Sequence, residues 1–281
     1  MNLDLINQKL NQLKQSQEKS ETGSGNKDLI FKPKKGQTVV RILPDTHRPD
    51  YPFSELHFYY DFGRTYLSPH TFGEPDPVLE FIQELKRPTQ DKEKVKDNWR
   101  LAGKLQPKSR TYVPILIRGY IDPNTKELVN LQEHEGVKFW GFGKTIYQEL
   151  LSVIADPDFG DITDLKTGRD VVVEYIPAEK DGAFPDIKVR VKPNQSPATS
   201  DPEVLEKIKQ MPDIFKHFTK PSYEELRDAL KAYMTPKSDQ KEEKPNPKPQ
   251  QPSEPDPLMD SSKFGDIADD FDKQFDDLFN N

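Results

Sequence analysis

Two stretches of the sequence alternate in the way expected of β-strands, where successive side chains point to opposite faces. From residue 110 to 120, one face is apolar and suits a core: Thr111, Val113, Ile115 and Ile117. The other face is basic and aromatic: Arg110, Tyr112, Leu116, Arg118 and Tyr120. In the second stretch Val137 and Phe139 are predicted to face one way, and Lys138, Trp140, Phe142 and Lys144 the other.

A sheet face that combines aromatic rings with cations suits an unpaired nucleic-acid strand. Bases stack on the rings, with about 1–3 kcal/mol each, and Lys or Arg contacts the phosphates. The alternative is an ordinary solvent-exposed strand face that carries Tyr and Arg without a ligand. The sequence does not decide between these two interpretations. On the first interpretation the base-stacking residues are Tyr112, Trp140 and Phe142, with Tyr59 and Tyr66 as weaker candidates, and the phosphate contacts are Lys108, Arg110, Arg118, Lys138, Lys144 and Arg41.

Other segments have the patterns of further strands and helices. Strands are expected at 38–43, 53–62, 171–176 and 187–191. Helices are expected after Asp76-Pro77, over 144–155, from about residue 200, and from the capping box at Ser222 to Met234. Residues 87–98 are predicted to form a charged loop. In the last strand Lys188, Arg190 and Lys192 face out, either as phosphate contacts or as an edge protected from aggregation.

These elements predict a β-rich α+β fold. Short strands, a helix after the fourth strand and polar insertions favour an OB-fold, a five-stranded Greek-key barrel, as the core. We place the core at residues 28–235, with an insertion at about 63–106. An arm at 1–24 precedes it, and a Pro-rich linker at 236–257 and a disordered acidic tail at 258–281 follow it.

Both ends carry apolar residues on polar segments. Leu3, Ile6, Leu10 and Leu13 form one thin helical stripe, which is expected to dock on the core of its own chain or on a neighbouring subunit. The tail alternates acidic with apolar residues, and a partner protein would contact Phe264, Ile267, Phe271, Phe275, Leu278 and Phe279.

Charge is distributed unevenly along the chain. The formal net charge of −7 over 281 residues is carried by the last 44 residues, and the rest of the chain balances to zero. Within the balanced part, residues 96–118 contain six Lys or Arg and one Asp. A basic segment of this kind is compatible with nucleic-acid binding despite the acidic total.

Motifs for catalysis or metal binding are absent from the sequence. There is no Cys, the five His residues show no ligand spacing, and no Walker loop, nucleophile elbow or His-Glu-x-x-His motif occurs. We therefore expect no enzymatic activity, no cofactor and no metal. No run of about 18 apolar residues occurs, so a soluble protein without a membrane segment is expected.

Several blocks resemble the single-stranded DNA-binding protein family of T-even-type bacteriophages. The first is Gly36-Gln37-Thr38-Val39-Val40-Arg41-Ile42-Leu43-Pro44. Further blocks, in the same order as in the family, are Lys108-Ser109-Arg110-Thr111-Tyr112, Ile115-Leu116-Ile117, Lys138-Phe139-Trp140-Gly141-Phe142-Gly143-Lys144, Ser222-Tyr223-Glu224-Glu225-Leu226 and the Asp-rich end.

The resemblance implies a zinc-less variant of that family. The family type member holds zinc with one His and three Cys, but here Asp76-Pro77-Val78-Leu79 stands where a Cys-Pro-Val-Cys would be. Asp76 and Leu79 are expected to cap and pack a helix instead. The family's basic N-terminal motif is also not clearly present, since Lys9 and Lys14 lie among Gln and Leu.

The resemblance also implies function. It implies cooperative binding of single-stranded DNA, without sequence specificity, during phage replication, recombination and repair in the cytoplasm of an infected bacterial host. The implied partners are single-stranded DNA, other copies of the chain along that DNA, and replication and recombination proteins at the tail. Two alternatives remain: a non-enzymatic adaptor that recruits replication partners through its tail, and, more distantly, a DNA-processing enzyme.

Overall fold

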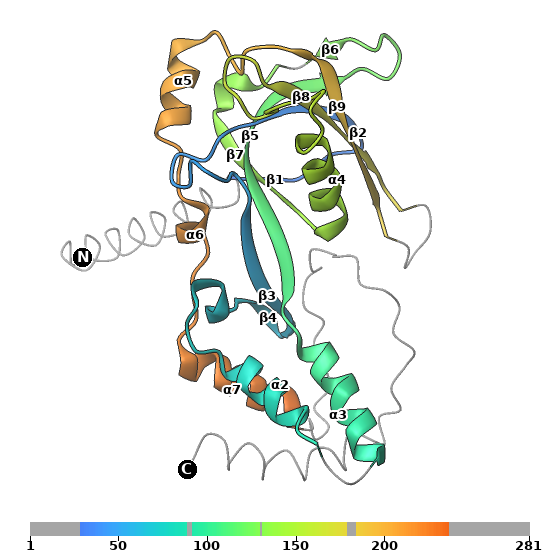
Figure 1. The fold of residues 1–281 in the computed structure, drawn as a ribbon, viewed down its shortest axis with the longest axis vertical. Coiled ribbons are helices and arrows are strands. Elements are labelled where there is room, and N and C mark those ends of the chain that lie inside the picture. The colour runs from blue at the N-terminus through green and yellow to red at the C-terminus, as the bar shows by residue number, and fades with distance from the viewer. Residues whose placement is uncertain (1–28, 89–91, 130, 179–183, 236–281) are drawn as a thin grey trace, which may run out of the picture. The chain divides into compact units, whose positions relative to one another are not determined.

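The structure, which is a computed structural model, combines β-strands with several helices (Figure 1). The structure describes residues 29–88, 92–129, 131–178 and 184–235. The arm at 1–24, the linker and the tail with its six candidate partner-binding residues lie outside the described residues. The chain divides into two compact units, Met1–Ser54 with Thr111–His217 and Glu55–Arg110 with Phe218–Asn281.

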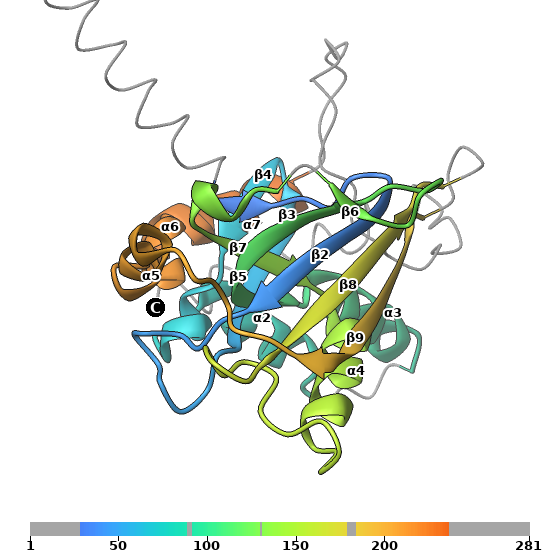
Figure 2. The same cartoon turned by 90° about the horizontal axis from the view of Figure 1, so that it is seen from above.

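The first unit contains most of the strands. Neighbouring strands hydrogen-bond in the order β1 (Ile30–Phe31), β7 (Val137–Phe142), β5 (Lys108–Ile121), β2 (Gly36–Ile42), β8 (Arg169–Ile176) and β9 (Asp186–Gln195). All neighbours are antiparallel except β1 and β7. Figure 2 shows β5, β2, β8 and β9 side by side. The predicted strands at 38–43, 110–120, 137–143, 171–176 and 187–191 are confirmed, and the short β6 (Leu128–Val129) pairs with β5.

The main core of this unit lies on one face of these strands. Val40 and Ile42 from β2, and Val113 and Ile115 from β5, are fully buried there. Helix α4 (Lys144–Ile154), at the predicted position, adds Ile146 and Leu150 to the same cluster. Burying one such side chain contributes about 1.5–3 kcal/mol, so this cluster fixes which face of each strand points inward.

A smaller core covers the opposite face of β5. Leu43 and Leu116 pack there with Val204 and Ile208 of α5 (Pro202–Lys209) and with Met211, just before α6 (Ile214–His217). Asp201 caps α5 by accepting a hydrogen bond from the Glu203 amide, which confirms a helix starting near residue 200. Strand β5 is therefore covered on both faces over residues 111–119.

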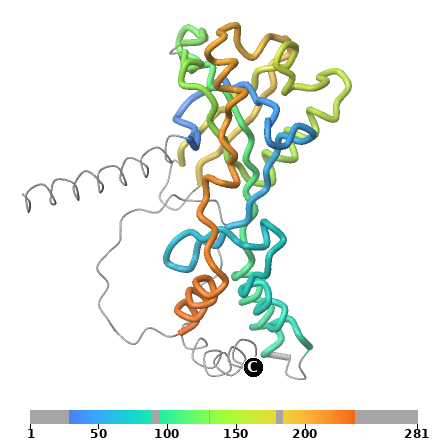
Figure 3. Tube along the Cα trace, turned by 90° about the vertical axis from the view of Figure 1, so that its left-hand side faces the viewer, coloured from blue at the N-terminus to red at the C-terminus, as the bar shows by residue number. Residues whose placement is uncertain are grey.

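The second unit is mainly helical. Strand β3 (Ser54–Phe62) begins at the last residue of the first unit and pairs with β4 (Arg64–Leu67). Helices α2 (Pro77–Leu85), α3 (Lys92–Leu105) and α7 (Tyr223–Met234) pack into one apolar cluster (Figures 1 and 3). Its centre includes Phe81, Leu101 and Leu230, each 2 % exposed or less.

The helix caps in this unit match the sequence. Asp76 caps α2 by accepting from the amides of Val78 and Leu79, with Pro77 at the first helical position, and Leu79 packs against the cluster. Ser222 caps α7 by accepting from the Glu225 amide. These two helix starts were predicted from local residues because a cap needs only its own first turn.

The predicted loop at 87–98 is wrong in its second half, because α3 begins at Lys92. Its charges conceal an apolar stripe, since the helix buries Leu101, Ala102 and Leu105 at helical spacing. Within the described residues, no helix has the length and apolarity needed to cross a membrane. The fold is a mixed α+β architecture with a large sheet and several helices, as the sequence predicted at that level.

Candidate nucleic-acid interface

The register between β5 and β7 places the basic and aromatic face of β5 and that of β7 on opposite sides of the sheet, although both were expected to bind nucleic acid. Trp140 lies opposite Val113, Phe142 opposite Thr111, and Lys138 opposite Ile115. Residues directly opposite each other in an antiparallel pair share a face. The aromatic face of β7 is therefore the core face of β5, whereas Tyr112, on the other face, lies opposite Gly141.

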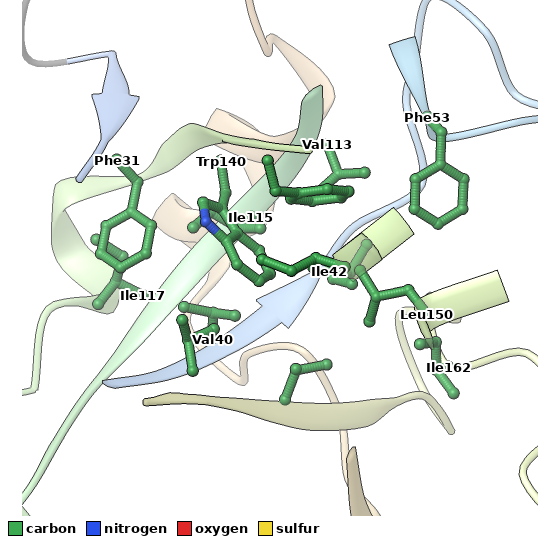
Figure 4. Close-up of a cluster of buried hydrophobic side chains, with 14 residues drawn as sticks. Phe31, Val40, Ile42, Phe53, Val113, Ile115, Ile117, Trp140, Leu150 and Ile162 are labelled. Carbon is green, nitrogen blue, oxygen red and sulfur yellow. The ribbon is translucent and has the colours of Figure 1, made fainter. Parts of the chain in front are cut away.

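Trp140 and Phe142 are core residues. Their side chains are 0 % and 1 % exposed, and their ring centroids lie 4.7 Å apart in an edge-to-face arrangement. Figure 4 shows Trp140 among Phe31, Val113, Ile115 and Ile42. A ring enclosed in this way has no free face for a base, so the prediction that these two residues stack on DNA is corrected to a packing role.

Arg41 and Arg118 are also structural. The Asp170 carboxylate accepts from Nε of Arg41 at 3.1 Å and from Nε of Arg118 at 3.2 Å. Arg41 is fully buried and also donates to the Ser196 carbonyl and hydroxyl, and burial, partly opposed by Asp170, lowers its pKa.

Arg118 is 9 % exposed and donates further to Glu133 and to the Pro197 carbonyl. Both guanidinium groups are thus occupied inside the first unit. The prediction that Arg41 and Arg118 contact phosphate is corrected, because their donors already have partners and little or no side-chain surface is open to a ligand.

Tyr112 lies against the glycine opposite it. A Cβ on Gly141 would lie 2.5 Å from Cε1 of Tyr112, so the ring crosses β7 where that strand has no side chain. The residue is 8 % exposed. Tyr112 therefore offers only a small part of its surface, and its predicted stacking role stays a prediction.

The two remaining lysines of this region differ in their surroundings. Lys138 pairs with Glu135, with 2.6 Å between Nζ and a carboxylate oxygen. Lys144 is exposed at the first residue of α4. Lys144 is thus the more accessible of these two predicted phosphate contacts.

Four of the residues predicted to contact DNA belong to the second unit. Lys108 is exposed and Arg110 is half-buried at the start of β5. Tyr59 is buried, with 3 % of its surface exposed, and its hydroxyl donates to Asp76 at 3.0 Å. Burial, and then the charge of Asp76, raise the pKa of Tyr59. The prediction that Tyr59 stacks on a base is corrected by this burial. Tyr66 is half-buried, with the Arg64 guanidinium 4.5 Å from its ring centroid.

The outer face of β9 is basic, as predicted. Ile187, Val189 and Val191 pack against the main core, and the alternate residues Lys188, Arg190 and Lys192 point away from it. Lys188 lies 3.6 Å from Asp186 and Lys192 lies 4.0 Å from Asp170. The Lys188–Asp186 pair is exposed and contributes little to stability, so Lys188 is available for exchange with a phosphate, whereas Lys192 pairs with the largely buried Asp170.

An exposed tryptophan was missed by the sequence interpretation. Trp99 of α3 is 55 % exposed, with Nζ of Lys86 5.3 Å from its ring centroid. Residues 87–98 were predicted to be a loop, so the face of Trp99 was not assigned. The available signal was the stripe of Leu101, Ala102 and Leu105, which places Trp99 off the buried face of a helix.

The zinc ligands of the resembling family have no fitting replacement here. One Asp76 oxygen accepts from two amides of α2, and the other accepts from Tyr59 and from the Ser68 hydroxyl at 2.5 Å. Both oxygens are thus used by donors. Within residues 29–88, 92–129, 131–178 and 184–235, no group of three or more His, Asp or Glu is placed to hold a metal ion.

Comparison with known families adds the class of protein. The family model described as gp32 DNA binding protein like matches residues 34–234, which include parts of both units and more than half of the chain. No curated protein matches the sequence. The chain therefore belongs to the gp32-like family of single-stranded DNA-binding proteins, as its sequence blocks indicated.

Proposed function

We propose that this protein binds single-stranded DNA cooperatively and without sequence specificity, during phage DNA replication, recombination and repair. Membership of the gp32-like family is the observation that carries the proposal. The antiparallel strands of the first unit are compatible with an OB-fold core, which we propose as the framework of the site.

Exposed cations supply the main binding energy in this proposal. Lys108, Lys144, Lys188 and Arg190 are exposed, and Arg110 is half-buried. Each phosphate that they neutralise releases condensed counterions, a contribution that is independent of base sequence. The binding is therefore expected to weaken with salt and to tolerate every base.

The proposed activity is not enzymatic. It requires only electrostatic attraction and stacking, and both act without a bond being made or broken. The competing proposal is an adaptor that recruits replication proteins through residues 258–281. The family match favours DNA binding as the primary role, because it covers residues 34–234 and stops before that segment.

The two ends have separate proposed roles. Residues 1–24 would associate with a neighbouring copy on DNA through Leu3, Ile6, Leu10 and Leu13. Residues 258–281 carry seven Asp against two Lys. They would compete with DNA for cations at low salt and, when released, bind replication and recombination proteins. The proposed location is the cytoplasm of the infected bacterial host.

The test is a titration of labelled oligo-thymidylate and of duplex DNA, followed by fluorescence anisotropy at two salt concentrations. The full chain should prefer the single strand, and its affinity should fall with salt by a log–log slope of about −0.7 per neutralised phosphate. Equal affinity for duplex, or no binding to either, would refute the proposal and favour the adaptor.

Truncation separates the roles of the ends. Deleting residues 1–24 should leave affinity for a short oligonucleotide nearly unchanged and lower it for a long strand. Deleting residues 258–281 should raise affinity at low salt, with a difference that shrinks as salt rises. If the shorter chains bind long and short strands like the full chain at every salt concentration, neither end has its proposed role.

A further inference from the structure

Helix α3 presents a large aromatic side chain to solvent. Trp99 is 55 % exposed, whereas the other tryptophan, Trp140, is fully buried. Indole is among the most favourable side chains to bury, because it removes a large apolar area from water. An exposed Trp in a unit that has its own apolar core therefore suggests contact with another molecule.

The surroundings of Trp99 are cationic. Nζ of Lys86 lies 5.3 Å from the ring centroid, and Lys96 and Arg100 are exposed on the same helix. Two acidic residues of α2 and α3 have partners: Glu84 pairs with Arg87 at 2.9 Å, and Asp97 pairs with Arg100 at 3.8 Å. Among the described residues, Lys86, Lys96 and Arg100 are therefore the cations considered with this ring.

We propose that Trp99 is a stacking platform for a base of unpaired DNA, with Lys86, Lys96 and Arg100 contacting the adjacent phosphates. The inference rests on the proposed function and adds a binding site within the second unit. An aromatic ring with flanking cations is the arrangement that binds single strands without sequence preference, because every base has a flat face and every nucleotide a phosphate.

The charges around Trp99 favour single-stranded DNA over the other partners that an exposed ring could bind, a second copy of the chain or an apolar protein surface. A second copy of the same basic face would be repelled, and an apolar partner would have to strip water from several cations. A polyanion with flat apolar groups satisfies both the ring and the charges. Single-stranded DNA has that composition.

The first test measures affinity for labelled oligo-thymidylate by anisotropy, with the full-length chain. Trp99→Ala should bind about 5- to 150-fold more weakly, and Trp99→Phe should retain most of the affinity because it keeps a flat ring. Phe72→Ala is the matched control. Phe72 is also exposed with a lysine over its ring, Lys220 at 5.4 Å, but that lysine is neutralised by Glu74 at 2.5 Å.

The second test uses tryptophan fluorescence of the unsubstituted protein. Because Trp140 is enclosed in the core, quenching by acrylamide reports Trp99. Saturating oligo-thymidylate should protect Trp99 from the quencher. In the Trp99→Ala chain, the emission of Trp140 reports folding of the first unit and far-UV circular dichroism reports the helices of the second, so a loss of affinity is not confused with unfolding.

The outcomes are distinguishable. If the unsubstituted protein does not bind oligo-thymidylate, the proposed function itself fails. If it binds, but Trp99 stays open to acrylamide and Trp99→Ala binds equally well, only the stacking site is refuted. A peptide of residues 258–281 that protects Trp99 when DNA does not would assign the site to the acidic tail instead.

Discussion

Trp140 lies directly opposite Val113 in the antiparallel pair of β5 and β7, and both side chains are fully buried in the main core of the first unit. This pairing gives Trp140 a structural role. Tyr112, one residue before Val113, lies on the opposite face of β5 and pairs with Gly141.

Trp140→Ala should lower the free energy of unfolding by about 3–5 kcal/mol, because it leaves a cavity in a close-packed core. Urea unfolding measures this value. Phe184→Ala, at a residue that is 42 % exposed, should change it by less than about 0.5 kcal/mol. The milder Trp140→Phe chain should bind DNA like the unsubstituted one; a stable Trp140→Phe protein with lost affinity would restore a direct role for this ring.

Gly141→Ala should displace the Tyr112 ring, since the new Cβ would lie 2.5 Å from Cε1 of Tyr112. Overpacking of this kind costs about 1–3 kcal/mol of unfolding free energy. The control is Gly103→Ala in α3, where a Cβ meets nothing within 4 Å and helix propensity improves by up to about 1 kcal/mol. Equal stabilities of the two variants would show that the Tyr112 ring moves away without cost.

Asp170→Asn should destabilise the first unit strongly, because Arg41 and Arg118 both lose their shared carboxylate in a buried setting. Removing one partner of a buried ion pair costs about 3–5 kcal/mol. Asp186→Asn breaks an exposed pair with Lys188 and should cost less than about 1 kcal/mol. Thermal unfolding of both variants measures the difference, and similar melting temperatures would contradict the role given to Asp170.

Acidification should destabilise the protein through His57. Burial, and then the positive charge of His70, lower the pKa of His57 below 6.5, the value of the unfolded chain. The unfolded state therefore binds the proton more tightly, so stability is complete above about pH 6.5 and is lost as the pH falls toward the folded pKa.

The free energy of unfolding, measured from pH 7.5 to 5, should fall less steeply in His57→Gln. His217, whose pKa is also lowered by burial, adds a slope of the same sign in both chains. An unchanged slope in His57→Gln would show that His57 does not couple protonation to folding.

The basic face of β9 can be tested by salt dependence. If Lys188 and Arg190 contact phosphates, replacing both with Ala should reduce the log–log salt slope of DNA binding by about 1.4, which is 0.7 for each contact. Lys207 and Lys209 of α5 are the matched pair of exposed lysines, and their double replacement should leave the slope unchanged. If the two double variants have equal salt slopes, the interpretation of β9 as a strand protected from aggregation is favoured.

The sequence by itself determined the elements that depend on neighbouring residues. The five predicted strands of the first unit, the helix at 144–155 and the caps at Asp76 and Ser222 are where their local patterns placed them. Alternation and capping act within a few residues, so they need no knowledge of the rest of the chain. The blocks that indicated the family are confirmed by the match over residues 34–234.

Only the tertiary structure decided which faces are covered. Alternation showed that Trp140 and Tyr112 each lie on a mixed face, but a shift of one residue in register moves every side chain to the other side of a sheet. The register with β5 sends Trp140 inward. Likewise, α5 covers Leu116, and Asp170, which is 52 residues away from Arg118, converts two candidate phosphate contacts into an internal ion pair. Such contacts depend on distant residues, and no local pattern encodes them.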